Sequence, residues 1–159
     1  MNDISELSIK TTTRSKLSIP RIVLGGIITG VVLFICSGIV NGTILSQDYK
    51  NWSDEMGNLI HPLSFSFSLG LWLIMSATQG VVSIWVYAGI SRIYGVGMKS
   101  VLITGFLIWI VSKLAVAIDL TALGVLTPRI VLGQLIGSLV AILLGIYLGS
   151  RFYRVEEPE

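Results

Sequence analysis

The chain has 159 residues, of which 53% are hydrophobic and only 13% are charged, with a mean hydropathy of +0.83. These values lie well outside the range of soluble domains, so the sequence predicts an integral membrane protein. The net charge of +2 comes from basic residues placed beside apolar segments, which excludes a nucleic-acid-binding surface. The single cysteine, Cys36, excludes an internal disulfide and a CxxC redox pair.

Residues 1–20 are rich in Ser and Thr and lack a sustained hydrophobic period, so they predict a flexible cytoplasmic tail. Four apolar segments follow, each near the roughly 20 residues that a helix needs to cross a bilayer. They cover about residues 22–41, 67–91, 100–124 and 129–149, and residues 151–159 form a second cytoplasmic tail. The sequence therefore predicts an all-α polytopic membrane protein with one four-helix transmembrane domain, residues 21–150.

The one long connection, residues 42–66, contains a short amphipathic pattern. Aromatic and apolar residues recur in it at three- and four-residue spacing, at Tyr49, Trp52, Met56 and Leu59 or Ile60. We expect a short interfacial helix in this first outer loop, with its aromatic rings at headgroup level. Ser46 is its candidate N-cap, and Gly57 weakens its end. An irregular solvated loop explains a pattern of only three turns equally well.

Lys and Arg residues are distributed unevenly between the two sides of the predicted bundle. Only Lys50 and Arg129 fall on the side of the long loop. The other side carries Lys10, Arg14, Lys16, Arg21, Arg92, Lys99, Arg151 and Arg154. The positive-inside rule then places both termini in the cytoplasm and the long loop outside. We expect a multi-pass protein of a bacterial inner membrane or a thylakoid-type membrane.

Small residues recur at every fourth position in two of the predicted spans. The first span carries Gly26 and Gly30, and the fourth carries Gly133, Gly137, Ala141, Gly145 and Gly149. Small residues let two helix backbones approach closely, as in GxxxG contacts. These two ridges predict helix packing, either within the bundle or against a second subunit.

The third span carries two charges, Lys113 and Asp119, inside its apolar sequence. At 1.5 Å per residue, Lys113 lies about 21 Å from the membrane boundary near Lys99, in the outer half of the bilayer. Six residues turn Asp119 about 120° away from Lys113, so the two do not form a pair on one helix face. Polar and amphipathic residues of the other spans fall at similar depths. We expect a polar cluster built from all four helices, with Lys113, Asp119, Gln134, Ser138, Asn41, Ser37, Trp72, Ser76 and Gln79.

Three interpretations of Lys113 stay open. Its side chain can extend outward to Asp119, Asn41 or headgroup oxygens, or it can pair with a carboxylate of another helix or subunit. In the third interpretation it holds an anionic ligand, a lipid headgroup or a proton in a water-accessible cleft.

No catalytic or cofactor-binding motif is found, because the chain lacks GxSxG, HExxH, P-loop and GxGxxG patterns. The single histidine, His61, precedes Pro62 near the expected outer start of the second span, where a surface histidine is the usual case. One histidine per chain could still ligate a group in an assembly. We expect no catalytic residue, no metal and no cofactor.

Several stretches resemble small four-span bacterial integral membrane proteins that are largely uncharacterised. They are "NGTIL" followed by "YKNW", "YAGISRIYGVG", "TGFLIW" and "GQLIGSLVAILLGIYLG". The resemblance covers about residues 22–154 and implies a topology without a function. Small multidrug transporters have a similar size, but the intramembrane glutamate of their first span has no counterpart here.

The sequence favours a non-catalytic accessory or assembly subunit of a larger membrane complex, or a homo-oligomer. Its expected partners are the lipid bilayer and either other membrane subunits or a second copy, through the small-residue ridges. The alternative is a small transporter or a protein that binds a lipid or another anionic ligand in the cluster around Lys113. An intramembrane enzyme is the third choice.

Overall fold

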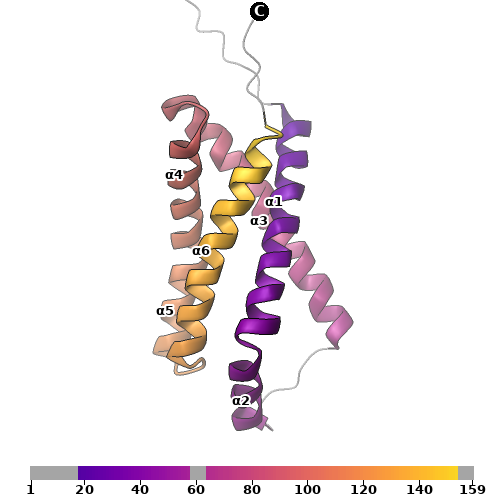
Figure 1. The fold of residues 1–159 in the computed structure, drawn as a ribbon, viewed down its shortest axis with the longest axis vertical. Coiled ribbons are helices and arrows are strands. Elements are labelled where there is room, and N and C mark those ends of the chain that lie inside the picture. The colour runs from indigo at the N-terminus through magenta and orange to yellow at the C-terminus, as the bar shows by residue number, and fades with distance from the viewer. Residues whose placement is uncertain (1–17, 58–63, 154–159) are drawn as a thin grey trace, which may run out of the picture.

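The computed structural model describes residues 18–57 and 64–153. Within these ranges the chain is helical and has no strand, and 4 helical segments are long and apolar enough to cross a membrane (Figure 1). The prediction of an all-α polytopic membrane protein is therefore confirmed. The predicted N-terminal tail to residue 17, the C-terminal tail from residue 154, and His61, Leu59 and Ile60 lie outside the described residues.

Three of the spans are somewhat longer than the hydropathy pattern indicates, and the third has the expected length but begins two residues earlier. The first consists of α1 (Ile19–Ile39) and a π-helical turn, η1 (Val40–Ile44), and the second is α3 (Phe65–Tyr94). The third joins α4 (Met98–Trp109), a second π-helical turn, η3 (Ile110–Leu114), and α5 (Ala115–Ala122). The fourth is α6 (Pro128–Ser150). Proline stands in the first turn of both α1 and α6, where its missing N–H group breaks no helical hydrogen bond.

The long loop contains a helix, α2 (Ser46–Met56), as its amphipathic pattern predicts. The expected N-cap is wrong, because Leu45 caps the helix and Ser46 is its first residue. The Ser46 hydroxyl instead donates to the Thr43 carbonyl oxygen at 3.0 Å, so its hydrogen bond goes back to the preceding turn and not to the N–H groups of α2. Gly57 ends the helix with a φ of 25°, a conformation that glycine adopts at low cost.

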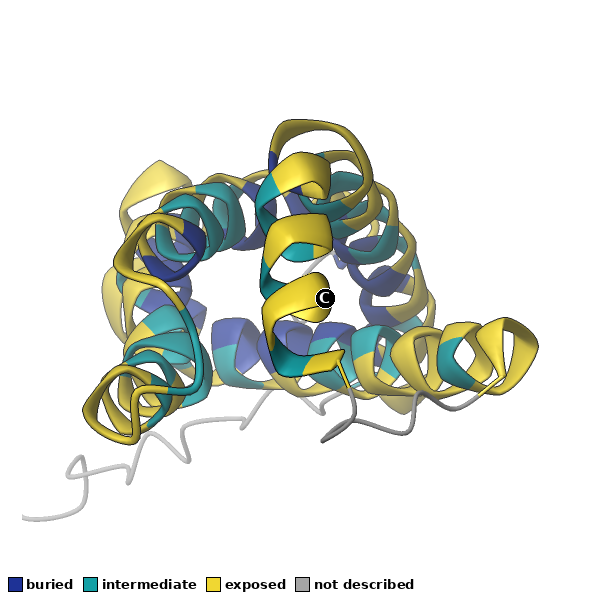
Figure 2. Ribbon diagram, turned by 90° about the horizontal axis from the view of Figure 1, so that it is seen from below, coloured by how far each residue is buried: buried dark blue, intermediate teal, exposed yellow. Residues whose placement is uncertain are grey.

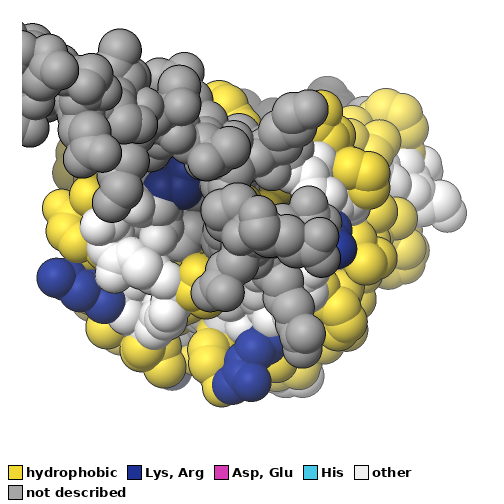
Figure 3. Space-filling view, turned by 90° about the horizontal axis from the view of Figure 1, so that it is seen from above, with side chains coloured by type: hydrophobic (Ala, Val, Ile, Leu, Met, Phe, Trp, Pro, Cys, Tyr) yellow, Lys and Arg dark blue, Asp and Glu magenta, His cyan; other side chains and the backbone are white. Residues whose placement is uncertain are grey.

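The first and last helices meet at one end of the molecule. α1 begins and α6 ends there, next to the turn between α3 and α4, and we call this the terminal end (Figure 1). Figure 3 shows Lys and Arg side chains around this face. The opposite end, which we call the loop end, carries α2 and the connection between α5 and α6. Every acidic residue of the described ranges lies in α2 or in α5, toward the loop end.

Buried residues face the centre of the bundle and exposed residues face outward (Figure 2). The core comes from α1, α3, α4 and α6 and contains Ile22, Leu33, Ile84, Tyr87, Ala88, Val101, Ala141, Ile142, Ile146 and Tyr153. Large apolar side chains cover the outer faces of the four spans. Because lipid tails are as apolar as leucine, such an exterior is the expected one inside a bilayer.

The small residues of α1 let it cross α3 at very short range. A Cβ atom at Gly26 would lie 2.5 Å from the Val81 Cα, and one at Gly30 would lie 2.7 Å from the Ala77 Cα. On the other helix, a Cβ atom at Gly80 would overlap the backbone of Gly26 and Gly30. This crossing therefore requires glycine on both helices.

The small residues of α6 face the first span. Ala141 is 1% exposed, and a Cβ atom at Gly145 or Gly149 would meet Thr29. The Thr29 hydroxyl lies 2.9 Å from the Gly25 carbonyl oxygen and 3.0 Å from that of Gly145, so its one hydrogen serves both helices.

The ridge of α6 continues toward the loop end. Gly133 lies against the Leu45 side chain, and Gly137 lies against the Val40 side chain. All five small residues of this ridge are thus covered by the same chain, as Gly26 and Gly30 are.

The loop half of α3 leaves the bundle. From Phe65 to Met75 every residue is exposed except the half-buried Ser68, whereas buried residues of α3 begin at Gly80. Figure 1 shows α3 crossing behind α1 and leaning away from it toward the loop end. The two helices therefore diverge beyond their crossing at Gly80.

Candidate functional site

A cleft of about 250 Å³ is lined by residues of all four spans. Its polar lining consists of Ser37, Asn41, Ser76, Gln79, Lys113 and Ser138, and its other lining residues are Leu33, Phe34, Gly38, Trp72, Met75, Ala141 and Ile142. A smaller cavity of about 100 Å³ adjoins it and adds Gln134, Val40 and Gly137 to the lining. One water in the liquid takes about 30 Å³, so the cleft has room for several water-sized groups.

The structure brings eight of the nine predicted cluster residues to these two cavities. They are Lys113, Gln134, Ser138, Asn41, Ser37, Trp72, Ser76 and Gln79. The ninth, Asp119, does not belong to the cluster, because it lies on α5 with its side chain exposed. The helical rotation of about 100° per residue turns it away from the cleft.

Among the residues that the structure describes, Lys113 is the one charged residue in the lining of either cavity. It is half-buried, and within residues 18–57 and 64–153 its ammonium group has no hydrogen bond and no ion pair. No carboxylate of this part of the chain therefore compensates its charge. A charge at the centre of a membrane helix costs about 2.5–3.5 kcal/mol on insertion scales, so a counter-charge in the cleft would be strongly favoured.

Other polar groups of the cleft also lack partners. The Oδ1 atom of Asn41 is buried and accepts no hydrogen bond from the described residues. The hydroxyl groups of Ser37 and Ser76 form no hydrogen bond with that part of the chain either. A buried polar group without a partner costs about 1–3 kcal/mol, so these groups are suited to a polar ligand.

Both π-helical turns border the cleft. Asn41 lies in η1 and Lys113 lies in η3. A π turn closes its hydrogen bonds five residues apart, and such turns are rare and occur frequently at functional sites. Two of the four spans thus depart from α-helical geometry where they carry a polar group of the cleft.

Side-chain hydrogen bonds connect the helices that form the walls of the cleft. The Gln79 Nε2 donates to the Ser112 Oγ at 3.1 Å, which joins α3 to η3 next to Lys113. The Trp109 Nε1 donates to the Leu135 carbonyl oxygen at 2.9 Å and joins α4 to α6. Both bonds anchor the part of the third span that directly precedes the lysine.

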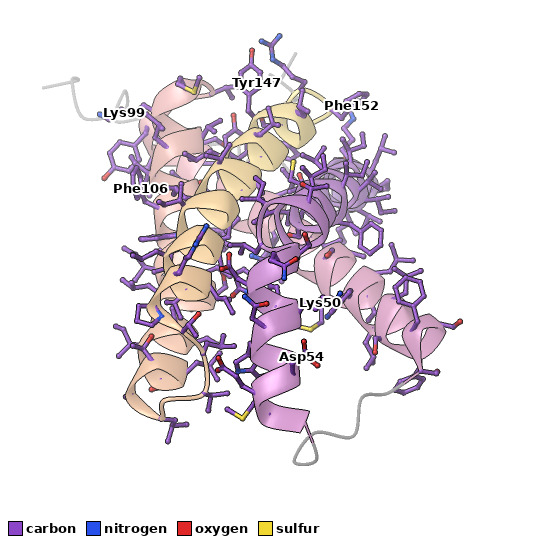
Figure 4. The ribbon with its side chains drawn as sticks, turned by 60° about the horizontal axis from the view of Figure 1, so that its bottom comes forward. Lys50, Asp54, Lys99, Phe106, Tyr147 and Phe152 are labelled. Carbon is purple, nitrogen blue, oxygen red and sulfur yellow. The ribbon has the colours of Figure 1, made fainter. Side chains whose placement is uncertain are left out.

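Helix α2 docks on the loop end of the bundle through its aromatic residues. The Trp52 Nε1 donates to the Val125 carbonyl oxygen at 2.5 Å, and the Gln134 Nε2 donates to the Tyr49 hydroxyl. Groups of the bundle therefore hold both rings, and their position at headgroup level stays a prediction. Figure 4 shows Lys50 and Asp54 on the side of α2 that faces away from α6.

The docked face of α2 also carries charge and a perturbed phenol. Asp48 Oδ2 lies 3.4 Å from Arg129 Nε, an ion pair that ties α2 to the start of α6. Burial raises the pKa of the Tyr49 phenol above its ordinary value of 10.0, while the hydrogen bond from Gln134 acts in the opposite direction. Since Gln134 also lines the smaller cavity, α2 stands at the loop end of the site.

In the part of the chain that the structure describes, no three His, Cys, Asp or Glu side chains lie close enough together to hold a metal ion. No protein-family model, curated protein or solved structure matches the chain. The interpretation of the site therefore rests on its own residues.

Proposed function

We propose that this chain is a small membrane protein that binds an anionic ligand in the cleft around Lys113. The observation that carries the proposal is an ammonium group that has no partner among the described residues, in a cleft whose described lining residues include no carboxylate. A cation would be repelled there, whereas a carboxylate or phosphate would offset the cost of the buried charge.

The other lining residues suit an anion that carries an apolar part. The ammonium group offers three donors, and the hydroxyls of Ser37 and Ser76 offer one each. The remaining wall is apolar, with Phe34, Met75 and Ile142 among its residues. Binding sites for small molecules commonly combine a mostly apolar wall with a few convergent polar groups.

The accessory-subunit and homo-oligomer hypotheses rest on the small-residue ridges, the short loops and the lack of a catalytic motif. Both ridges contact helices of the same chain, so they favour neither role over ligand binding. Those roles stay predictions, and the cleft is the feature that points to a specific chemistry.

The orientation of the protein is part of the proposal. Among the described residues, Arg21, Arg92, Lys99 and Arg151 lie at the terminal end, and Lys50 and Arg129 lie at the loop end. The positive-inside rule then turns the terminal end to the cytoplasm of a bacterial or thylakoid-type membrane. A membrane-impermeant maleimide is expected to label Lys50→Cys in intact cells. Labelling only after lysis would indicate the opposite orientation, with the loop end in the cytoplasm.

Binding is tested with the purified protein in mild detergent, titrated with dioleoylphosphatidylglycerol and, separately, with glycerol phosphate. Native mass spectrometry counts the bound molecules. Hydrogen bonds to charged groups are worth about 1.5–3 kcal/mol, so Lys113→Met is expected to weaken binding roughly 10- to 150-fold. Lys50→Met removes an exposed cation of α2 and is expected to change nothing. Equal binding by the wild type and Lys113→Met would refute the proposal.

A further inference from the structure

The cleft has one side on which its lining residues are exposed. Trp72 is 58% exposed and Met75 is 66% exposed on α3, and Gly38 is exposed on α1. All three line the cleft, so they mark its mouth. The mouth lies between α1 and the loop half of α3, where the two helices diverge (Figure 1).

The mouth lies at membrane depth. At 1.5 Å per residue, Gly38 is about 24 Å along the helix from Ile22, which is inside a hydrocarbon core about 30 Å thick. Trp72 and Met75 lie about 10 and 15 Å along the tilted α3 from Phe65, on the same side of the bilayer. The mouth therefore faces the acyl chains and headgroup boundary of the leaflet at the loop end.

Other sides of the cleft are closed by contacts. Val40 and Leu45 pack onto Gly137 and Gly133 and close the gap between the first span and α6. The hydrogen bond from Gln79 to Ser112 ties α3 to the third span. Toward the loop end, α2 is held on α6 by the hydrogen bond between Gln134 and Tyr49.

We infer that the ligand is a membrane-dissolved anionic amphiphile that enters sideways from the lipid, through the mouth between α1 and α3. This inference rests on the proposed function and adds the ligand class and its route. The anionic headgroup reaches Lys113 inside, while the acyl chain stays between Gly38 and the apolar face of α3 formed by Trp72 and Met75. A water-soluble anion would have no apolar part to place against that face.

Glycine 38 provides the decisive variant. A Cβ atom at Gly38 would meet nothing within 4 Å, so Gly38→Leu fits the backbone and places an isobutyl group in the mouth. Gly89 is equally open on the terminal half of α3, away from the cleft, and Gly89→Leu is the matched control. Leucine favours the helix over glycine, so both variants are expected to fold.

The wild type is expected to bind dioleoylphosphatidylglycerol more tightly than glycerol phosphate in detergent solution. Gly38→Leu is expected to weaken lipid binding at least about tenfold, and Gly89→Leu to leave it unchanged. If Gly38→Leu is not folded by circular dichroism, Met75→Trp narrows the mouth from α3 and is expected to have the same effect.

Three outcomes would overturn the inference. They are unchanged lipid binding in the mouth variants, equal loss in Gly89→Leu, and tighter binding of glycerol phosphate than of the lipid. In each case a loss of binding in Lys113→Met would still uphold the proposed function. If Lys113→Met binds as the wild type does, the proposed function itself fails, whatever the mouth variants show.

Discussion

Replacing Gly80 by alanine is expected to drive α1 away from α3 and to lower the thermal stability of the protein in detergent markedly. The new Cβ atom would overlap the backbone of Gly26 and Gly30, and backbone atoms cannot rotate aside as a side chain can. Overpacking a well-packed interior costs about 1–3 kcal/mol, and a clash with rigid backbone lies at the upper end of that range.

Gly89→Ala is the control for this prediction. Gly89 lies in the same helix and has open space around it, so alanine there is expected to stabilise α3 by up to about 1 kcal/mol. Unfolding can be followed by the reaction of Cys36, the single thiol of the chain, with a maleimide dye during heating. Equal melting temperatures for Gly80→Ala and Gly89→Ala would contradict the close crossing of α1 and α3.

Replacing Lys113 by methionine is expected to stabilise the protein in the absence of anionic lipid. The unpaired charge is removed, and the flexible methionine side chain has a similar length and fills the cleft. Insertion scales set the gain at no more than about 2.5–3.5 kcal/mol. Adding dioleoylphosphatidylglycerol is expected to raise the melting temperature of the wild type more than that of Lys113→Met, because the variant binds the lipid more weakly.

A loss of stability in Lys113→Met, in place of the expected gain, would assign Lys113 a structural role. If a carboxylate outside the described residues paired with Lys113, its removal would leave that partner unpaired and would destabilise the protein. A fall in the melting temperature of Lys113→Met, with no change in Lys50→Met, would therefore contradict the binding cleft.

The membership of the cluster could be predicted because depth and rotation along a helix follow from residue counting alone. Counting 1.5 Å and 100° per residue places Ser37, Ser76 and Gln134 at depths near that of Lys113, and the two cavities contain all of them. The same counting turns Asp119 about 120° away from Lys113, in agreement with its exposed position on α5.

The docking of α2 could not be predicted from its amphipathic pattern. That pattern shows which face of a helix avoids water, and a lipid surface or a protein surface can equally cover it. The groups that hold Tyr49 and Trp52 are Gln134 and a main-chain carbonyl at Val125, which are distant in sequence. The small-residue ridges raise the same difficulty. A glycine such as Gly26 or Gly149 gives the same sequence pattern whether the helix packed against it belongs to this chain or to another.

Two features that shape the cleft leave no trace in hydropathy. The lean of α3 depends on packing against its neighbours, and an apolar segment of a given length is compatible with many tilts. The π-helical turns at Asn41 and Lys113 interrupt no apolar period, so no pattern in the sequence marks them. Together they decide that the polar residues line an open cleft.

The contact between Lys113 and an anionic headgroup can be measured directly by solid-state NMR. The protein is labelled with ¹⁵N at lysine Nζ and placed in bilayers that contain dioleoylphosphatidylglycerol, and ³¹P pulses reveal which Nζ atoms lie near phosphorus. The Lys113 signal is the one missing from the Lys113→Met sample. We expect that signal to lose intensity under ³¹P dephasing. Full retention of its intensity, while the signals of surface lysines decay, would contradict a phosphate bound at Lys113.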